Sequence, residues 1–149
     1  TFDGVKRRLE LLGRVCDIAV YDDFAHHPTA IATTLQGMRA RRGEGRLIAL
    51  VEPRSNTMRM GEHRKQLAAS TATADLVYWF QPPGMNWSLE SVVEHSTAAA
   101  QLVDNIDELA QRVAVEAKPG DQIVIMSNGS FGGIHQKLLA QLEKANSHG

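Results

Sequence analysis

Acidic and imidazole side chains gather within residues 22–28. Asp22 and Asp23 are followed by His26 and His27, and Pro28 comes directly after them. Carboxylates can accept ribose hydroxyls, hold Mg²⁺ or orient an imidazole, while histidine can donate to phosphate or transfer a proton near neutral pH. The stretch therefore suits a nucleotide contact, acid–base chemistry, or a metal site that uses both carboxylates and both imidazoles. A structural alternative is that Asp22 or Asp23 caps the helix that follows.

A second polar stretch covers residues 52–61. Its guanidinium groups, on Arg54 and Arg59, suit carboxylate recognition because each can fork to both oxygens. Further hydrogen-bonding side chains lie between them: Ser55, Asn56 and Thr57. The alternative is an exposed loop in which the arginines are solvated.

A third stretch, residues 127–133, reads Ser-Asn-Gly-Ser-Phe-Gly-Gly. Its glycines would let backbone N–H groups approach a ligand, and the N-terminus of a following helix favours an anion. The order of the glycines fits neither G-x-G-x-x-G nor a Walker P-loop. A tight turn between a strand and a helix explains this stretch equally well.

Each polar stretch follows an apolar run, which indicates a strand that is followed by a loop and then a helix. The predicted strands cover residues 8–12, 15–21, 47–51, 76–80, 99–103 and 122–126, with a turn at Gly13-Arg14 between the first two. Helical spacing predicts helices over 28–41, 61–70, 88–94, 105–118 and from 134 onward. This alternation predicts a Rossmann-like α/β fold: a mostly parallel sheet of about six strands, helices on both faces, and one antiparallel edge strand. The three polar stretches should then meet at the carboxyl edge of the sheet.

Composition excludes several classes of function. A chain of 149 residues suits one domain, and a net charge of −1 offers no basic face for nucleic acid. No apolar run reaches the ~18 residues of a membrane span. The single Cys16 excludes a disulfide framework and fits a cytoplasmic protein. Because the chain begins at Thr1 rather than Met, we expect it to be a fragment of a longer protein.

The three stretches together resemble a known family. Residues 22–29, Asp-Asp-Phe-Ala-His-His-Pro-Thr, closely resemble the motif that opens the C-terminal domain of the Mur ligases, and residues 4–10 resemble the entry to that domain. Residues 52–59 and 127–133 resemble the murein peptide ligase branch, whereas the alanine-adding branch has a Pro-His-Arg-Tyr type of sequence in the second stretch. Residues 1–149 are therefore identified as one Mur ligase C-terminal domain from a three-domain enzyme.

The resemblance implies an activity for the full enzyme. That enzyme would join UDP-N-acetylmuramate to the tripeptide L-alanyl-γ-D-glutamyl-meso-diaminopimelate in peptidoglycan recycling in the bacterial cytoplasm. It would use ATP and Mg²⁺ and form an acyl phosphate that the peptide amine attacks. In this family the central domain carries the P-loop and the metal site. We therefore expect no ligation by this chain alone, and no nucleic-acid or membrane partner.

The resemblance also implies roles for individual residues. Asp23 should contact the nucleotide ribose, Arg8 should lie near the nucleotide, and His26 should lie near the phosphates or reacting groups. Tripeptide contacts are a looser expectation for Arg54, Ser55, Asn56, Thr57, Arg59, Ser127 and Asn128. The alternatives are an alanine-adding ligase, a stand-alone hydrolase with a metal held by Asp22, Asp23, His26 and His27, and a non-enzymatic nucleotide-binding module.

Overall fold

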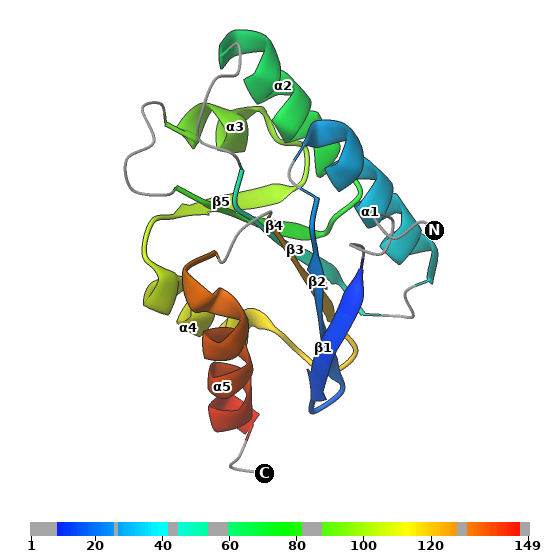
Figure 1. Ribbon diagram of the computed structural model, residues 1–149, viewed down its shortest axis with the longest axis vertical. Coiled ribbons are helices and arrows are strands. Elements are labelled where there is room, and N and C mark those ends of the chain that lie inside the picture. The colour runs from blue at the N-terminus through cyan, green and yellow to red at the C-terminus, as the bar shows by residue number, and fades with distance from the viewer. Residues whose placement is uncertain are drawn as a thin grey trace, which may run out of the picture.

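A six-stranded sheet organises the chain, with the strand order β1-β2-β6-β3-β4-β5 (Figure 1). The computed structural model describes residues 9–25, 27–41, 45–53, 60–81, 88–127 and 131–146. All strand pairs are parallel except β1 with β2, which are antiparallel. The strands are β1 (Glu10–Val15), β2 (Ile18–Asp23), β3 (Leu47–Val51), β4 (Leu76–Phe80), β5 (Ala99–Val103) and β6 (Gln122–Met126). The helices are α1 (Pro28–Arg41), α2 (Met60–Ser70), α3 (Glu90–His95), α4 (Ile106–Glu116), α5 (Ile134–Asn146) and the 3₁₀ turn η2 (Phe131–Gly133).

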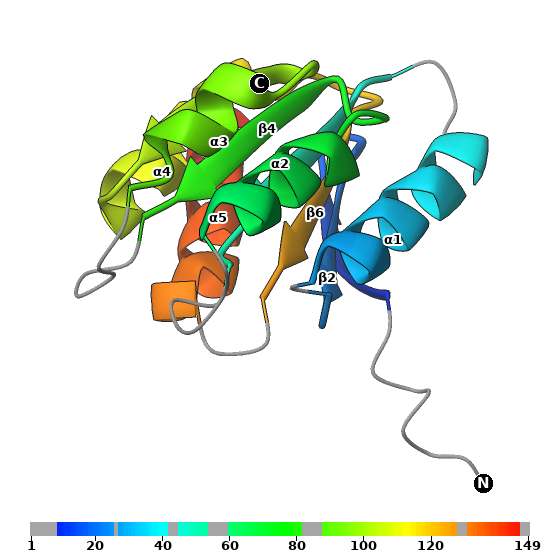
Figure 2. The same cartoon turned by 90° about the horizontal axis from the view of Figure 1, so that it is seen from above.

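Helices cover both faces of this sheet, which confirms the predicted fold class. Successive strand residues point to opposite faces, so Ile48 and Leu50 enter one core while Leu47, Ala49 and Val51 enter the other. The first core is closed by α4 and α5, and the second by α1, α2 and α3. Figure 2 shows α1 and α2 on one side of the sheet and α5 on the other. No described helix has the length and apolar character needed to cross a membrane.

The hairpin between β1 and β2 differs from the sequence prediction. The turn lies at Cys16-Asp17, and Gly13 sits inside β1 beside an irregularity in the β1–β2 register. Cys16 and Asp17 have φ angles of 50° and 66°. Two left-handed residues match the twist of the flanking strands in a two-residue hairpin, and glycine usually supplies them. The prediction was wrong because the glycine lies beside an irregularity within the strand pairing and not at the turn.

The amino edge of the sheet is tied together by Asp121. Its carboxylate is buried and accepts hydrogen bonds from the backbone N–H groups of Arg46 and Lys118 at 2.9 Å each. Arg46 Nη2 adds an ion pair at 2.9 Å, and its Nη1 reaches Glu116 at 2.7 Å. Burial raises the pKa of the Asp121 carboxyl, but the hydrogen bonds from Arg46 and Lys118 outweigh burial and lower the pKa below its usual value. This network joins the starts of β3 and β6 to the end of α4, far from the polar carboxyl edge.

Candidate functional site

The carboxyl ends of β2, β6 and β3 meet at one edge of the sheet, as the sequence predicts. The Ser127 N–H, one residue past β6, donates to the Asp23 carbonyl at 3.2 Å. On the other side, the Glu52 N–H, one residue past β3, donates to the Met126 carbonyl at 3.0 Å. The Ser127 hydroxyl donates to Glu52 Oε1 at 2.6 Å. The described parts of the three polar stretches therefore form one continuous edge with Ser127 at its centre.

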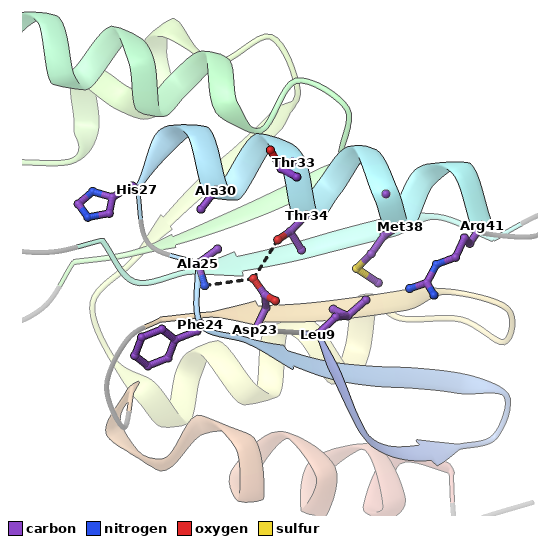
Figure 3. A pocket seen from close by; sticks show the side chains of 11 residues that line it. Leu9, Asp23, Phe24, Ala25, His27, Ala30, Thr33, Thr34, Met38 and Arg41 are labelled. Carbon is purple, nitrogen blue, oxygen red and sulfur yellow. Dashed lines mark hydrogen bonds between the residues drawn. The ribbon is translucent and has the colours of Figure 1, made fainter. Parts of the chain in front are cut away.

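The side chains of the adjacent residues Asp22 and Asp23 point to opposite faces of the sheet. Asp23 is 6% exposed, and its Oδ2 accepts the Ala25 N–H at 3.1 Å and the Thr34 hydroxyl at 2.9 Å. Thr34 belongs to α1, so Asp23 faces that helix (Figure 3). Asp22 Oδ1 instead lies 2.9 Å from His135 Nε2 in the first turn of α5. The two side chains diverge because neighbouring strand residues point in opposite directions.

This divergence bears on two interpretations of the motif. The contacts given above for these carboxylates are with Ala25, Thr34 and His135, and capping of α1 by Asp22 or Asp23 stays a structural alternative. His27 precedes the first helical residue, Pro28. A metal bound jointly by Asp22 and Asp23 would require carboxylates that face the same way. Within the described part of the chain, no group of three or more acidic, histidine or cysteine side chains is placed to hold a metal ion.

Asp23 borders a groove of about 690 Å³ along the exposed side of α1 (Figure 3). Pockets for small molecules typically enclose roughly 300–1,000 Å³. The groove runs from Phe24 and His27 at the start of α1 to Arg41 at its end, and apolar side chains form much of its wall. Its lining comprises Leu9, Asp23, Phe24, Ala25, His27, Ala30, Thr33, Thr34, Gly37, Met38 and Arg41. A flat apolar ring with a hydroxyl-bearing sugar could occupy such a groove, with Asp23 as the hydroxyl acceptor.

Only two of the predicted site residues fall within the described structure. Asp23 and Ser127 lie at the same edge, joined through their backbones. The others lie outside the described residues: Arg8, His26, Arg54, Ser55, Asn56, Thr57, Arg59 and Asn128.

Among the described residues, sequence reasoning missed Glu52, Thr34 and His135, which contact this edge. Strand alternation, carried one residue past β3, could have placed Glu52 beside Ser127 once the order β3–β6 was known. His135 and Thr34 carry no local signal because their partners are 113 and 11 residues away.

Comparison with known proteins identifies the family. The sequence matches the family described as Mur ligase, glutamate ligase domain, over residues 7–129. The chain belongs to the Mur ligases. It is 49% identical over 145 residues to the UDP-N-acetylmuramate–L-alanyl-γ-D-glutamyl-meso-2,6-diaminoheptandioate ligase of Escherichia coli strain K12. The match covers 97% of this chain but 32% of the E. coli protein, so the chain spans about a third of that relative's length.

Solved structures agree with this family assignment. A murein peptide ligase from Psychrobacter arcticus superimposes with a TM-score of 0.85 at 49% identity, covering 92% of this chain and 30% of that one. The MurF ligase of Thermotoga maritima, solved in complex with ADP, superimposes with a TM-score of 0.67 at 19% identity. That match covers 96% of this chain and 32% of the MurF chain, and it shows a shared fold. The Rossmann-like sheet described above is thus the fold of a Mur ligase C-terminal domain.

Proposed function

We propose that the chain is the C-terminal domain of a three-domain ligase that joins UDP-N-acetylmuramate to L-alanyl-γ-D-glutamyl-meso-diaminopimelate with ATP hydrolysis to ADP. The observation that carries the proposal is the 49% identity, over 97% of the chain, with the E. coli ligase named for these substrates. ATP and Mg²⁺ would be held mainly by the central domain. The cytoplasm is the proposed location because ATP and the UDP-sugar are found there.

Asp23, the proposed nucleotide contact that the structure describes, lies on the α1 side of the edge. The Asp23 carboxylate borders the groove, and hydrogen bonds from Ala25 and Thr34 fix its orientation before any ligand arrives. A fixed acceptor loses little freedom on binding a ribose hydroxyl. Arg8 would lie near the nucleotide, and His26 near the phosphates or reacting groups.

The proposed peptide contacts follow β3 and β6 in the sequence. The tripeptide carries several carboxylates, which guanidinium groups bind with two parallel hydrogen bonds. Arg54 and Arg59 are proposed for this role, and Ser127 lies at the carboxyl edge beside Glu52. The remaining proposed contacts are Ser55, Asn56, Thr57 and Asn128.

Steady-state kinetics of the full-length enzyme test these assignments. Asp23→Ala should raise the KM for ATP, and Arg54→Ala should mainly raise the KM for the tripeptide. Each loses one charge-assisted hydrogen bond, worth roughly 1.5–3 kcal/mol, so the expected rises are about 10- to 150-fold. Asp107→Asn is a suitable control because its carboxylate is exposed on α4. Changes within twofold for both test variants would refute the site assignment.

Two further measurements test the reaction and the role of the domain. Offering L-alanine in place of the tripeptide separates the proposed activity from that of an alanine-adding ligase. ADP release by the isolated 149-residue chain should stay at background, since the P-loop is proposed to lie in another domain. Turnover by the isolated chain would overturn that part of the proposal.

A further inference from the structure

Glu52 is held in a defined orientation at the carboxyl edge. Its N–H donates to the Met126 carbonyl, and its Oε1 accepts the Ser127 hydroxyl at 2.6 Å. The β3–β6 register pairs Val51 with Met126, so Glu52 and Ser127 are the next neighbours along the two strands. The residue is half-buried. Its carboxylate is therefore anchored through both its backbone and its side chain, as a preorganised binding group would be.

No basic side chain in the described ranges forms an ion pair with Glu52. Ion pairs in the described ranges with other carboxylates include Arg39 with Asp75, Arg46 with Glu116 and Asp121, Arg112 with Glu108, His135 with Asp22, and Lys137 with Asp107. A half-buried carboxylate loses hydration, and a cation delivered by a ligand would offset that cost.

The other two carboxylates at this edge are already engaged. Asp22 contacts His135, and Asp23 accepts two hydrogen bonds on the α1 side. Alternation along the strands places Glu52 and Ser127 on the opposite side from Asp23, toward α4 and α5. A ligand that reaches Glu52 would therefore occupy a different part of the edge from the proposed nucleotide groove.

We propose that Glu52, oriented by Ser127, binds an ammonium group of the incoming peptide. This inference rests on the proposed function. Of the three proposed substrates, only the tripeptide carries an aliphatic amine, at its N-terminus and at the distal end of diaminopimelate. The Ser127 hydroxyl occupies Oε1 of Glu52 and holds the carboxylate in place. The second carboxylate oxygen then binds an alkylammonium group by a charge-assisted hydrogen bond. Glu52 thus makes the edge selective for the peptide.

Glu52→Gln in the full-length enzyme is the direct test. Glutamine keeps an acceptor oxygen for the Ser127 hydroxyl and nearly the same volume, but it removes the charge. The KM for the tripeptide should rise about 10- to 100-fold, while the KM values for ATP and UDP-N-acetylmuramate stay within twofold. Ser127→Ala leaves the charge but frees the carboxylate, so a smaller rise is expected. Glu143→Gln, on the exposed side of α5, is the matched control and should change nothing.

Peptide analogues identify the ammonium group without any variant. Analogues lacking the N-terminal amine or the distal amine are measured as competitive inhibitors of the wild-type enzyme. The analogue that lacks the bound amine should have an inhibition constant raised by the same factor as Glu52→Gln raises the KM for the tripeptide. In the Glu52→Gln enzyme, the inhibition constant of that analogue should not rise further. If the wild type ligates but neither amine matters, or if Glu52→Gln leaves the tripeptide KM unchanged, the inference is wrong while the proposed function stands. Absence of ligation by the wild type would refute the proposed function itself.

Discussion

His135 Nε2 lies 2.9 Å from Asp22 Oδ1, and this contact joins the end of β2 to the first turn of α5. The two residues are 113 positions apart in the chain. Asp22 is therefore engaged on the α5 side, while its neighbour Asp23 faces α1. The contact also holds the start of α5 against the end of β2, where Asp23, the residue proposed to contact the nucleotide, lies.

The Asp22–His135 contact should stabilise the domain measurably. We expect Asp22→Ala and His135→Ala each to lower the free energy of unfolding by about 1 kcal/mol, since a partly buried hydrogen bond is lost. The double variant should lose less than the sum, with a coupling energy of about 0.5–1.5 kcal/mol. Urea unfolding of the 149-residue chain measures all three variants. The exposed Glu108–Arg112 pair is the control, with an expected coupling of about 0.3–0.5 kcal/mol. Strict additivity at Asp22 and His135 would show that the contact contributes nothing.

Gly132 should tolerate alanine poorly for two separate reasons. Its φ is 59°, which costs other residues about 1–2 kcal/mol, and an added Cβ would lie 2.6 Å from Ile106 Cγ1. Gly132→Ala is therefore expected to lower the free energy of unfolding by about 2–4 kcal/mol.

Gly133→Ala provides the matched comparison for Gly132→Ala. Gly133 has a φ of 77° but no atom within 4 Å of its added Cβ, so only the conformational cost applies. Thermal or urea unfolding should rank Gly132→Ala as the more harmful change. Repeating both in an Ile106→Ala background should remove most of the difference. Equal losses in the original background would contradict the proposed clash.

Asp121 should make the domain sensitive to acid. Its pKa in the folded chain is lowered from 3.8 by the hydrogen bonds of Arg46 and Lys118, which outweigh the opposing effect of burial. A lowered folded pKa means that the stabilisation is fully present above the unfolded pKa and is lost as the pH falls through the folded pKa. Asp121→Asn should therefore cost about 2–3 kcal/mol near neutral pH, and the difference from wild type should shrink below about pH 4.

Urea unfolding of wild type and Asp121→Asn across this pH range checks the acid prediction. Asp107→Asn is the control because its side chain is 77% exposed and pairs with Lys137 at the surface. Its effect should stay below about 1 kcal/mol. A gap between wild type and Asp121→Asn that does not vary with pH would argue against the titration of Asp121 as its source.

The sequence by itself determined the order and type of the elements and the edge at which the polar stretches meet. Apolar runs such as residues 47–51 and helical spacing over residues 28–41 are local patterns, and local patterns suffice to predict strands and helices. Parallel strands then bring their carboxyl ends together without further information. The Mur ligase resemblance likewise depends on short motifs readable along the chain.

Only the tertiary structure decided which groups contact one another at that edge. Ser127 contacts Glu52 only because β6 and β3 are neighbours in the sheet, and the two residues are 75 positions apart in the sequence. Alternation along β2 points Asp22 and Asp23 to opposite faces, but the partners they meet there, His135 and Thr34, depend on which helix covers each face. Long-range strand order and helix placement follow from the packing of the whole core, which no local segment encodes. The turn at Cys16-Asp17 was missed for a related reason. The pairing of β1 with β2, rather than the nearby glycine, sets the position of the turn.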